Sequence, residues 1–552
     1  MSFKHTSILL LTLMVIATTA NAQYIREVDI TGRAYFKNDE SSKLIVGQTN
    51  GDAVAVSSIQ EASASGDIDI LINHFNSSGI VLSSRQWGES GESEIANAAI
   101  SFSASEILIV GQDNNYADAL IAAIDYTTHS VIWQVSLGDP LYTEELNAVT
   151  EVGSTGEYIA VGRVFYNGRN EIYAVRFDNT GTVLWSSRNF DGPSFPNPYT
   201  SLEPTNLVDV PGASYMLVTG NAIDINGLRR VFAAQVDKTT GQVVGFRTYQ
   251  LQISSNQDQC IAGDVCMISN SPSLVFTTYE GSVWGTAHIS YMRLSSTLMP
   301  MLVATYDATW GFPNGYSYGL NIHPDPANNQ LVIGYKFGLD PLDLAPGLLA
   351  IDPTTGTVNS ATGYENFSLL IGSGWVRALS NHYYFRTGWQ GTQFEIVKTD
   401  LSGNSGSNCQ MSPSPTITPG SGSVNHSQYS FDYDHHGTTQ TVNLTSAHVN
   451  GTNTEPTCGI SGGWTIPFKK APTSLDEATE QHAVYPSLLN SESVVTVQSD
   501  RMVTERVNVA ISNSLGQIIY QESTSIEAEG KLQLPAGLFE KGINFISIKT
   551  AD

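Results

Sequence analysis

The chain contains little charge, and this scarcity excludes several classes of protein. Only 14% of its 552 residues are charged, and 26 Lys+Arg stand against 52 Asp+Glu, which gives a formal net charge of −26. Phosphate affinity comes from lysines and arginines that release counterions, so we expect no nucleic-acid partner. The acidity equally disfavours an anionic membrane surface. The hydrophobic content of 41% is too high for a disordered chain.

Long hydrophobic runs are also missing. The longest N-terminal run, residues 8–17, is shorter than the roughly 20 residues that span a bilayer. It follows Lys4 and precedes Ala20-Asn21-Ala22, the pattern of a secretory signal peptide with its cleavage site. We therefore expect residues 1–22 to be a signal peptide cleaved after Ala22. The mature chain is then exported, without a transmembrane segment, to the extracellular space or the outer-membrane surface.

Cysteine is scarce, with four in the chain. Four cysteines allow three connectivities, among which sequence alone does not choose. Proximity favours the bridges Cys260–Cys266 and Cys409–Cys458. No C-x₂-C pair and no histidine at ligand spacing accompanies them, so we expect no metal site.

What the sequence does contain is an internal repeat over about residues 29–405. Each copy has an apolar strand ending in Gly, a second strand ending in Asp, a tight turn and a third strand; the best copy runs from EYIAVGR (157–163) to EIYAVRFDNTGTVLW (171–185). Such a period predicts a propeller or solenoid, and about 50 residues accommodate four strands. We predict an all-β chain with a seven-bladed β-propeller over residues 23–405. The residues marking the tight turns are Asn76, Asp125, Asp178, Asp237, Leu294, Asp352 and Asp400.

The copy after Asp352 lacks a good outer strand, because LSGNSGSN follows Asp400. We expect the N-terminal segment QYIREVDI (23–30) to supply that strand and so to close the ring. The turns AIDYTTHSVIW (123–133) and LLAIDPTTGTV (348–358) resemble the docking repeats of quinoprotein-like propellers. The Asp and Gly types suit turn structure, so we interpret them as structural rather than as cofactor ligands.

Beyond the repeats the composition changes twice. Residues 406–465 are rich in Ser, Thr, Gly and Pro, and YSFDYD with QTVNLTS predicts a β-ribbon stapled by Cys409–Cys458. Residues 466–483 are a polar linker.

Residues 484–552 contain short strands typical of a small β-sandwich. Tyr485-Pro486, ISNSLGQIIY (511–520) and LPAGLFEKGINFISI (534–548) resemble the C-terminal sorting domain of type IX secretion in Bacteroidetes-type bacteria. This resemblance implies the type IX machinery as a partner and an address outside the cell, not an activity.

The sequence contains no recognisable set of catalytic residues. GISGG (459–463) matches a nucleophile elbow but lacks the flanking strand and helix. FDYDHHG (431–437) is more typical of a solvated turn than of a metal site. The segment from Asp224 to Gly227 is more typical of a hairpin turn than of a calcium loop. A quinone-dependent dehydrogenase would resemble this repeat type, but the chain lacks the adjacent cysteines of those enzymes. We expect no cofactor and no catalytic residue that the sequence identifies.

The connections on one face of the propeller are long and aromatic. Loops carry function on rigid scaffolds, and aromatics stack on sugars or anchor proteins. We therefore predict a non-catalytic surface or secreted module that binds an extracellular glycan or protein at this long-loop face. The alternatives are a carboxylate-based polysaccharide hydrolase or lyase at the same face, and a structural envelope spacer. The candidate binding residues are Tyr166, Trp284, Trp310, Tyr316, Tyr318 and Trp389.

Overall fold

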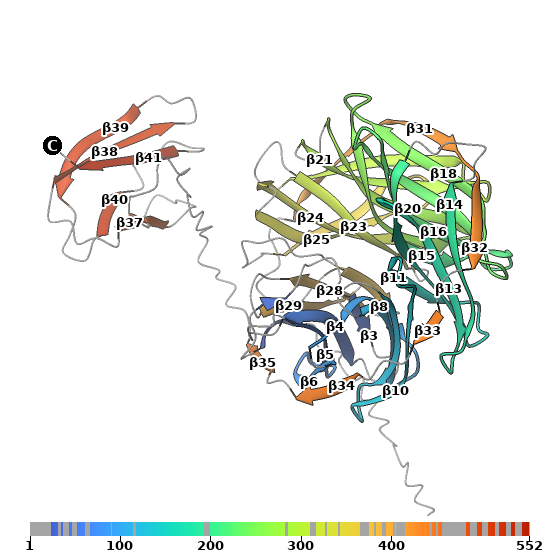
Figure 1. Cartoon of the computed structure of the whole chain (residues 1–552). Helices are drawn as coiled ribbons and strands as arrows, with labels where there is room; N and C mark the ends of the chain where they lie inside the picture. The colour runs from blue at the N-terminus through green and yellow to red at the C-terminus, as the bar shows by residue number, and fades with distance from the viewer. Residues whose placement is uncertain are drawn as a thin grey trace, which may run out of the picture. The chain divides into compact units, whose positions relative to one another are not determined.

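Figure 1 shows the computed structural model, in which the described residues form strands and turns and no helix. The chain divides into two compact units, Met1–Pro456 and Thr457–Asp552. The predicted signal peptide lies outside the described residues. The structure describes residues 24–30, 35–36, 43–46, 52–60, 67–89, 91–113, 118–191, 199–281, 285–309, 316–325, 328–340, 343–364, 375–379, 382–388, 393–400, 403, 414–435, 438–440, 444–448, 451–454, 482–485, 494–499, 506–513, 518–525, 531–535 and 544–550.

The larger unit is built from antiparallel groups of strands that follow one another along the chain. Most groups contain four strands paired in chain order. The groups are β3 (Lys43–Val46), β4 (Ala53–Gln60), β5 (Ile68–Phe75) and β6 (Val81–Gly88), with the short β2 (Tyr35–Phe36) beside β4; β7 (Ile95–Ser101), β8 (Glu106–Asp113), β9 (Asp118–Asp125) and β10 (Ser130–Gly138); β11 (Thr143–Glu151), β12 (Glu157–Tyr166), β13 (Arg169–Asp178) and β14 (Val183–Asp191); β15 (Tyr199–Asp209), β16 (Tyr215–Asp224), β17 (Arg229–Asp237) and β18 (Val243–Gln252); β19 (Gln259–Ile268), β20 (Ser271–Tyr279), β21 (Ala287–Leu294) and β22 (Pro300–Thr309); β23 (Tyr316–Asp325), β24 (Gln330–Asp340), β25 (Asp343–Ile351) and β26 (Val358–Gly363); and β27 (Trp375–Leu379), β28 (His382–Gly388) and β29 (Gln393–Thr399).

The first strands of these groups form a closed cycle. β3, β7, β11, β15, β19, β23 and β27 contact one another in that order, and β27 contacts β3. The predicted N-terminal closure is confirmed, because β1 (Tyr24–Ile30) pairs antiparallel with β29 and places Tyr24 opposite Lys398. Radial antiparallel groups around a closed ring of inner strands are the architecture of a β-propeller.

Alternating side chains of each middle strand enter two different cores. In β12, Ile159 and Val161 belong to the core shared with β15–β18, whereas Tyr158 and Ala160 belong to the core shared with β7–β10. Successive side chains of a strand point to opposite faces, so a strand between two neighbours must be apolar on both. This explains why the second and third strands of each copy are nearly continuous apolar runs.

The turn aspartates have the structural role that the sequence predicts. Asp178 Oδ1 accepts the Thr180 hydroxyl and the backbone N–H groups of Thr180 and Thr182, and these hydrogen bonds, that of the hydroxyl first, hold the pKa of Asp178 below its usual value. The next carbonyl, that of Asn179, accepts the indole N–H of Trp133 from the preceding group at 2.9 Å. One marker residue was wrong: the fifth turn is built on Ser295, whose Oγ accepts Thr297 N–H and Met299 N–H, and not on Leu294.

Residues 416–454, which contain strands β30 to β35, form a belt. Each belt strand pairs antiparallel with an outer strand of the propeller rather than with another belt strand, so the predicted β-ribbon is wrong. The belt is drawn in orange at the propeller rim in Figure 1. Its pairings are β30 (Thr416–Gly420) with β22, β31 (Ser423–Gln428) with β18, β32 (Phe431–His435) with β14, β33 (Thr438–Gln440) with β10, β34 (Thr445–His448) with β6 and β35 (Gly451–Thr454) with β1.

Apolar belt side chains enter the cores between neighbouring groups. Phe431 is 6% exposed and its ring centroid lies 4.7 Å from that of Phe246, while Leu444 is 7% exposed in the core between β3–β6 and β7–β10. Asp434 accepts two hydrogen bonds from Arg188, with an Nη2–Oδ2 distance of 2.6 Å. FDYDHHG therefore begins as a paired strand, and its prediction as a solvated turn was wrong. The belt is an integral part of the propeller unit because it contributes to these cores.

The structure contradicts the predicted Cys260–Cys266 bridge. Both cysteines are buried and free, and both lie on the single strand β19. Six residues of extended strand separate them by roughly 20 Å, whereas a disulfide requires Cα atoms about 4.4–6.8 Å apart. CIAGDVC resembled a clamped loop by its spacing, but its alternation is that of a strand. Cys409 and Cys458 lie outside the described residues.

The smaller unit contains two three-stranded antiparallel sheets, with strand orders β36-β37-β40 and β39-β38-β41. The strands predicted over this module are all present among the described residues. They are β37 (Val494–Ser499), β38 (Arg506–Asn513), β39 (Ile518–Ser525), β40 (Lys531–Pro535) and β41 (Asn544–Thr550), preceded by β36 (His482–Tyr485).

Candidate functional site

Three of the predicted binding residues lie at strand ends rather than in long loops. Tyr166 ends β12, and Tyr316 and Tyr318 begin β23. The connection between β12 and β13, one of those predicted to be long, is a two-residue turn in which Asn167 and Gly168 have φ values of 50° and 79°, the geometry of a tight hairpin. Trp284, Trp310 and Trp389 lie outside the described residues. Tyr166, Tyr316 and Tyr318 nevertheless all lie at the long-loop face.

Tyr316 and Tyr318 form an aromatic group with Tyr279. The rings of Tyr316 and Tyr318 are nearly parallel, with an interplanar angle of 8° and centroids 6.3 Å apart, and both side chains are half-buried. Tyr279, the last residue of β20, meets Tyr318 edge to face at 5.9 Å. Residues two apart on a strand share a face, which is why the Y-S-Y sequence places the first two rings side by side.

A histidine between two carboxylates lies at the same end of the β19–β22 group. His288 Nδ1 lies 2.5 Å from Asp307 Oδ1, and its Nε2 lies 3.1 Å from Glu280 Oε1. Burial alone would lower the pKa of His288, but the hydrogen bond and charge of Asp307 and the charge of Glu280 outweigh burial and raise it. The result is an imidazole ring held between two carboxylates that are 37% and 40% exposed. These carboxylates can accept hydrogen bonds from a hydroxyl-rich ligand.

This group does not have the geometry of a metal site or of a free general base. The two carboxylates occupy opposite ends of the imidazole ring, so the three side chains cannot converge on one ion. No cluster of three or more His, Cys, Asp or Glu suited to a metal occurs in the described part of the chain. Both ring nitrogens of His288 are engaged, which leaves neither available to take a proton from a ligand.

Asp258 anchors the segment that carries Glu280. It is fully buried, and its carboxylate accepts the backbone N–H groups of Ile253, Ser254 and Ser255 and, from across the sheet, that of Gly281 at 2.8 Å. Burial would raise the pKa of Asp258, but these backbone hydrogen bonds together hold it far below its usual range. A carboxylate that accepts several N–H bonds is a strong local anchor.

Replacing Asp258 with Asn is expected to destabilise the protein by about 2 kcal/mol, because charge-assisted bonds become neutral and one acceptor oxygen becomes a donor. The depressed pKa means that the wild-type contribution is complete above the unfolded aspartate pKa of about 3.9 and is lost as the pH falls. Chemical denaturation at pH 7 and pH 3 measures both effects. Gln257→Ala, an exposed change in the same loop, should alter stability by less than about 0.5 kcal/mol. Equal losses in the two variants would contradict the anchor.

A second carboxylate group lies at the long-loop face near the β3–β6 group, but it is closed to solvent. Glu94 is fully buried, and both its oxygens lie 3.3 Å from the backbone nitrogen of Glu89. Burial first, and the nearby charges of Asp113 and Asp69 next, raise the pKa of Glu94 to about 8 despite that hydrogen bond. Glu94 lies just before the β-bulge of strand β7. The residues at the same place before the bulges of β19 and β23 are Cys260 and Ser317, and the side chain of each also accepts a backbone N–H. This position therefore has a structural role, and Glu94 with Asp69 is not an open catalytic pair.

Tyr166 belongs to a different cluster from Tyr316 and Tyr318. The guanidinium carbon of Arg188 lies 5.2 Å from the Tyr142 ring centroid, 5.3 Å from that of Tyr166 and 5.0 Å from that of Phe190. Arg188 is also the residue that holds Asp434 of the belt. Tyr166 thus covers a cation that attaches the belt, which gives it a structural reason to be present.

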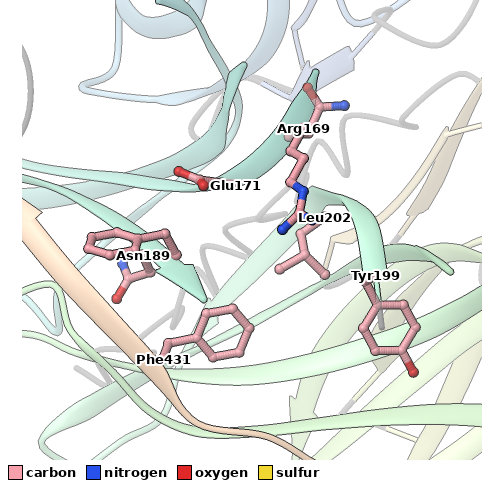
Figure 2. Close-up of a pocket in the computed structure, with 8 residues that line it drawn as sticks. Arg169, Glu171, Asn189, Tyr199, Leu202 and Phe431 are labelled. Atoms are coloured by element: carbon pink, nitrogen blue, oxygen red, sulfur yellow. The ribbon is translucent and has the colours of Figure 1, made fainter. Parts of the chain in front are cut away.

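A small pocket adjoins this cluster, between β13, β14, β15 and the belt (Figure 2). Figure 2 shows Phe431 of β32 facing the space between Asn189 and Leu202, while Tyr199 points away. The Tyr199 hydroxyl donates to Thr248 Oγ1 at 2.8 Å. The pocket is lined by belt and core residues, so it is a packing gap at the belt junction and not the site around His288.

Five residues of this group were not among those predicted from the sequence: Tyr279, Glu280, His288, Asp307 and Asp258. His288 lies inside an ordinary strand sequence, and its two carboxylate partners are 8 and 19 residues away along the chain. No local motif joins them, because the contact depends on the pairing of β21 with β20 and β22. The loop composition did indicate the face at which this group lies.

Comparisons with known proteins yield only distant structural similarity. No protein-family model and no curated protein matches the sequence. Solved structures with a similar fold include the polysaccharide lyase Uly1 (10% identity, 69% of this chain and 100% of that chain, TM-score 0.44). They also include an ulvan lyase (10% identity, 69% of this chain and 96% of that chain, TM-score 0.39). A third is a quinohemoprotein alcohol dehydrogenase from Pseudomonas putida (9% identity, 68% of this chain and 76% of that chain, TM-score 0.37). The fold assignment rests on the strand pairing of this chain. Within the described residues there is no helix with the length and apolar character needed to cross a membrane.

Proposed function

We propose that this protein is an exported, seven-bladed β-propeller that binds a neutral glycan at its long-loop face. The closed cycle of inner strands supports the blade count. Each blade takes its number from the order of the inner strands: blade 1 begins at β3, blade 2 at β7, blade 3 at β11, blade 4 at β15, blade 5 at β19, blade 6 at β23 and blade 7 at β27, with β1 as the outer strand of blade 7.

The address outside the cell is supported by sequence alone. The N-terminal signal-peptide pattern and the resemblance of residues 484–552 to type IX sorting domains both favour export to the cell surface. The type IX machinery is then the partner of the C-terminal module. An exported chain also meets an oxidising environment, in which thiols can pair.

The single observation that carries the binding proposal is the tyrosine group beside the His288 carboxylates. Tyr316 and Tyr318 offer parallel, half-buried rings, and Glu280 and Asp307 offer partly exposed acceptors at the same end of neighbouring sheets. Sugar rings stack on aromatics while their hydroxyls donate to carboxylates. The net charge of −26 repels polyanions, which favours a neutral glycan over a sulfated or uronate-rich one.

The geometry favours binding over catalysis. Both ring nitrogens of His288 are occupied, and two carboxyl groups whose pKa is raised by burial, Glu94 and Asp118, are closed to solvent. A glycoside hydrolase needs two carboxyl groups that reach the scissile bond from an open cleft. The partly exposed carboxylates at this face, Glu280 and Asp307, are instead both engaged by the imidazole of His288, at opposite ends of its ring.

A glycan array with wild type and the double variant Tyr316→Ala/Tyr318→Ala tests the proposal. Stacking contributes about 0.5–1.5 kcal/mol for each ring, so the double variant should bind about 5- to 150-fold more weakly. Tyr215→Ala serves as the control, because this tyrosine begins β16 and its hydroxyl donates to Ser296 at the short-turn face.

Unchanged binding in the double variant would reject the site. Binding to no glycan, together with capture of a surface protein that the double variant loses, would replace the glycan by a protein ligand. A face that binds neither would leave the propeller as a structural spacer.

A further inference from the structure

Three large apolar side chains stand exposed at the long-loop face of blades 3 and 4. Leu141 is 77% exposed, Ile225 74% and Phe165 46%, and the first two are the most exposed large apolar side chains among the described residues. Leu141 lies in the connection from β10 to β11, Phe165 near the end of β12 and Ile225 in the turn from β16 to β17. One exposed apolar residue is ordinary on a protein surface, but a group of them marks an interaction site.

Strand pairing brings these side chains into one group. Phe165 lies opposite Asn170 on β13, and Asn170 pairs in turn with Ser201 at the start of β15. Ser201 lies opposite Ile223, two residues before Ile225. Neighbouring strands are about 4.8 Å apart, so these three steps put Ile223 roughly 15 Å from Phe165.

Leu141 lies at the other side of Phe165 and is held there by its own turn. Its backbone N–H donates to Asp139 Oδ1 at 3.0 Å. The next residue, Tyr142, has its ring centroid 4.7 Å from that of Tyr166, which follows Phe165. The group therefore fits within the roughly 800 Å² that each partner buries in a standard protein–protein interface.

The turn that presents Ile225 has a counterpart at the short-turn face. Asp224 Oδ1 accepts the backbone N–H groups two and four residues further on, at 2.8 and 3.0 Å, and Asp178 forms the same turn. The residue after the aspartate is Ile225 in the first turn and Asn179 in the second. This turn therefore does not require an apolar residue after its aspartate, and the local structure gives no reason for Ile225.

Arginines accompany the apolar side chains. Arg169 is exposed and pairs across its hairpin with Tyr166, and the half-buried Arg229 lies opposite Ile223. Figure 2 shows Arg169 beside Leu202 of β15, so this arginine lies at the junction of blades 3 and 4. Five of the 26 Lys+Arg of the chain are gathered at this end of the two blades: Arg163, Arg169, Arg188, Arg229 and Arg230.

Three of these arginines are used within the propeller unit. Arg163, Arg188 and Arg230 lie 2.8, 2.6 and 3.7 Å from carboxylate oxygens of the same unit. Arg169 and Arg229 belong to the two hairpins that also present Phe165 and Ile225. In a protein with a net charge of −26, an acidic partner is repelled by most of the surface and can be oriented only by such a group.

We propose that Leu141, Phe165, Ile225, Arg169 and Arg229 form a docking patch for a protein that presents an apolar side chain flanked by carboxylates. Apolar anchors beside arginine and tyrosine are the composition of interface centres. The patch lies on blades 3 and 4, and its occupant does not depend on the glycan site of blades 5 and 6.

Two other occupants fit the patch less well. The aliphatic side chains of Leu141 and Ile225 have no aromatic face on which a sugar ring stacks, which favours a protein over a glycan. A second copy of this chain, bound through two-fold symmetry, would bring the same arginines against one another. The docked protein is therefore a different chain.

A phage-displayed library of random dodecapeptides tests the patch on the full-length protein. The library is depleted on the variant Phe165→Ser/Ile225→Ser and then selected on wild type. We expect peptides in which Asp or Glu flanks an apolar residue, and a synthetic copy should bind this variant at least tenfold more weakly than wild type, because interface anchors each contribute more than about 1 kcal/mol. A selection that returns no peptide, or peptides without acidic residues, would overturn the proposal.

Matched variants separate the patch from a general loss of structure. Leu184 is also 46% exposed and lies in blade 3 near the short-turn face, so Leu184→Ser should bind the peptide as tightly as wild type. The denaturant midpoint of Phe165→Ser/Ile225→Ser should stay at the wild-type value, because both positions are exposed. Equal loss of binding in the Leu184 variant would overturn the patch.

The arginines are tested separately. Arg169→Gln/Arg229→Gln should weaken peptide binding at least fivefold, and 0.5 M NaCl should weaken wild-type binding in the same direction. Polygalacturonate serves as the anionic glycan probe. If it binds wild type, and the arginine variant loses that binding while the Phe165/Ile225 variant keeps it, the protein partner is overturned in favour of an acidic glycan. Tyr316→Ala/Tyr318→Ala should leave peptide binding unchanged, so failure of the patch and failure of the glycan site are distinguishable.

Discussion

Replacing Phe431 with Ala is expected to destabilise the propeller unit by about 3–5 kcal/mol, the cost of emptying a buried phenylalanine site. Phe431 is the belt anchor in the core between blades 3 and 4, where it packs against Phe246 and lines the gap beside Leu202. Loss of its ring removes the apolar attachment of β32 and leaves the Arg188–Asp434 pair to hold that strand. Denaturant unfolding monitored by tryptophan fluorescence measures the loss.

The neighbouring change Asp432→Ala is the matched control. Asp432 lies on the same strand but its side chain is exposed, so its replacement should alter stability by less than about 0.5 kcal/mol. Limited proteolysis should cut the belt of the Phe431 variant and spare that of the control. A loss in the Phe431 variant no greater than in the control would mean that the belt merely rests on the propeller.

The second large effect concerns pH. The pKa of Glu94 is raised to about 8 in the folded protein and stands near 4.5 in the unfolded chain. Between these values the folded state binds the extra proton, so its stabilising contribution is complete below about pH 4.5 and is lost as the pH rises through about 8. Glu94→Gln removes this ionisation, and it should raise the free energy of unfolding at pH 9 by about 2–4 kcal/mol relative to wild type.

Denaturation curves at pH 5, 7 and 9 measure this difference between the variant and wild type. Glu106→Gln is the control, because Glu106 is half-buried and lies at the end of β8 away from Glu94. The free energy of unfolding of this variant should differ from that of wild type by the same amount at all three pH values. If the Glu94 variant also runs parallel to wild type, then Glu94 is ionised in the folded protein and its charge is compensated.

The repeat fold could be predicted because each copy encodes it locally. Strands β11 to β14 coincide with the predicted apolar runs, and Asp178 makes the turn bonds expected of that residue type. Ring closure by β1 followed from counting strands at both ends. These features depend on periodicity and on turn chemistry within about 50 residues.

The belt and the site could not be predicted in the same way. A short polar strand such as β33 (TTQ) contains no signal for its partner, and the nearest strand in sequence was the natural but wrong choice. His288, Glu280 and Asp307 meet only because three strands pair in one register. The spacing of Cys260 and Cys266 was misleading for a related reason. Two cysteines six residues apart can meet when the segment between them is a loop, but they lie far apart when it is an extended strand.

The position of β1 between β29 and the last belt strand has a consequence for how the chain folds. The first strand to emerge must wait for partners from the far end of the propeller unit, and contacts so distant in sequence form slowly. Until then the ring is open and the inner strands of blades 1 and 7 lack their neighbours. We therefore expect the newly made chain to persist as an extended, threadable polymer, which is the state that a protein must keep while it crosses a membrane.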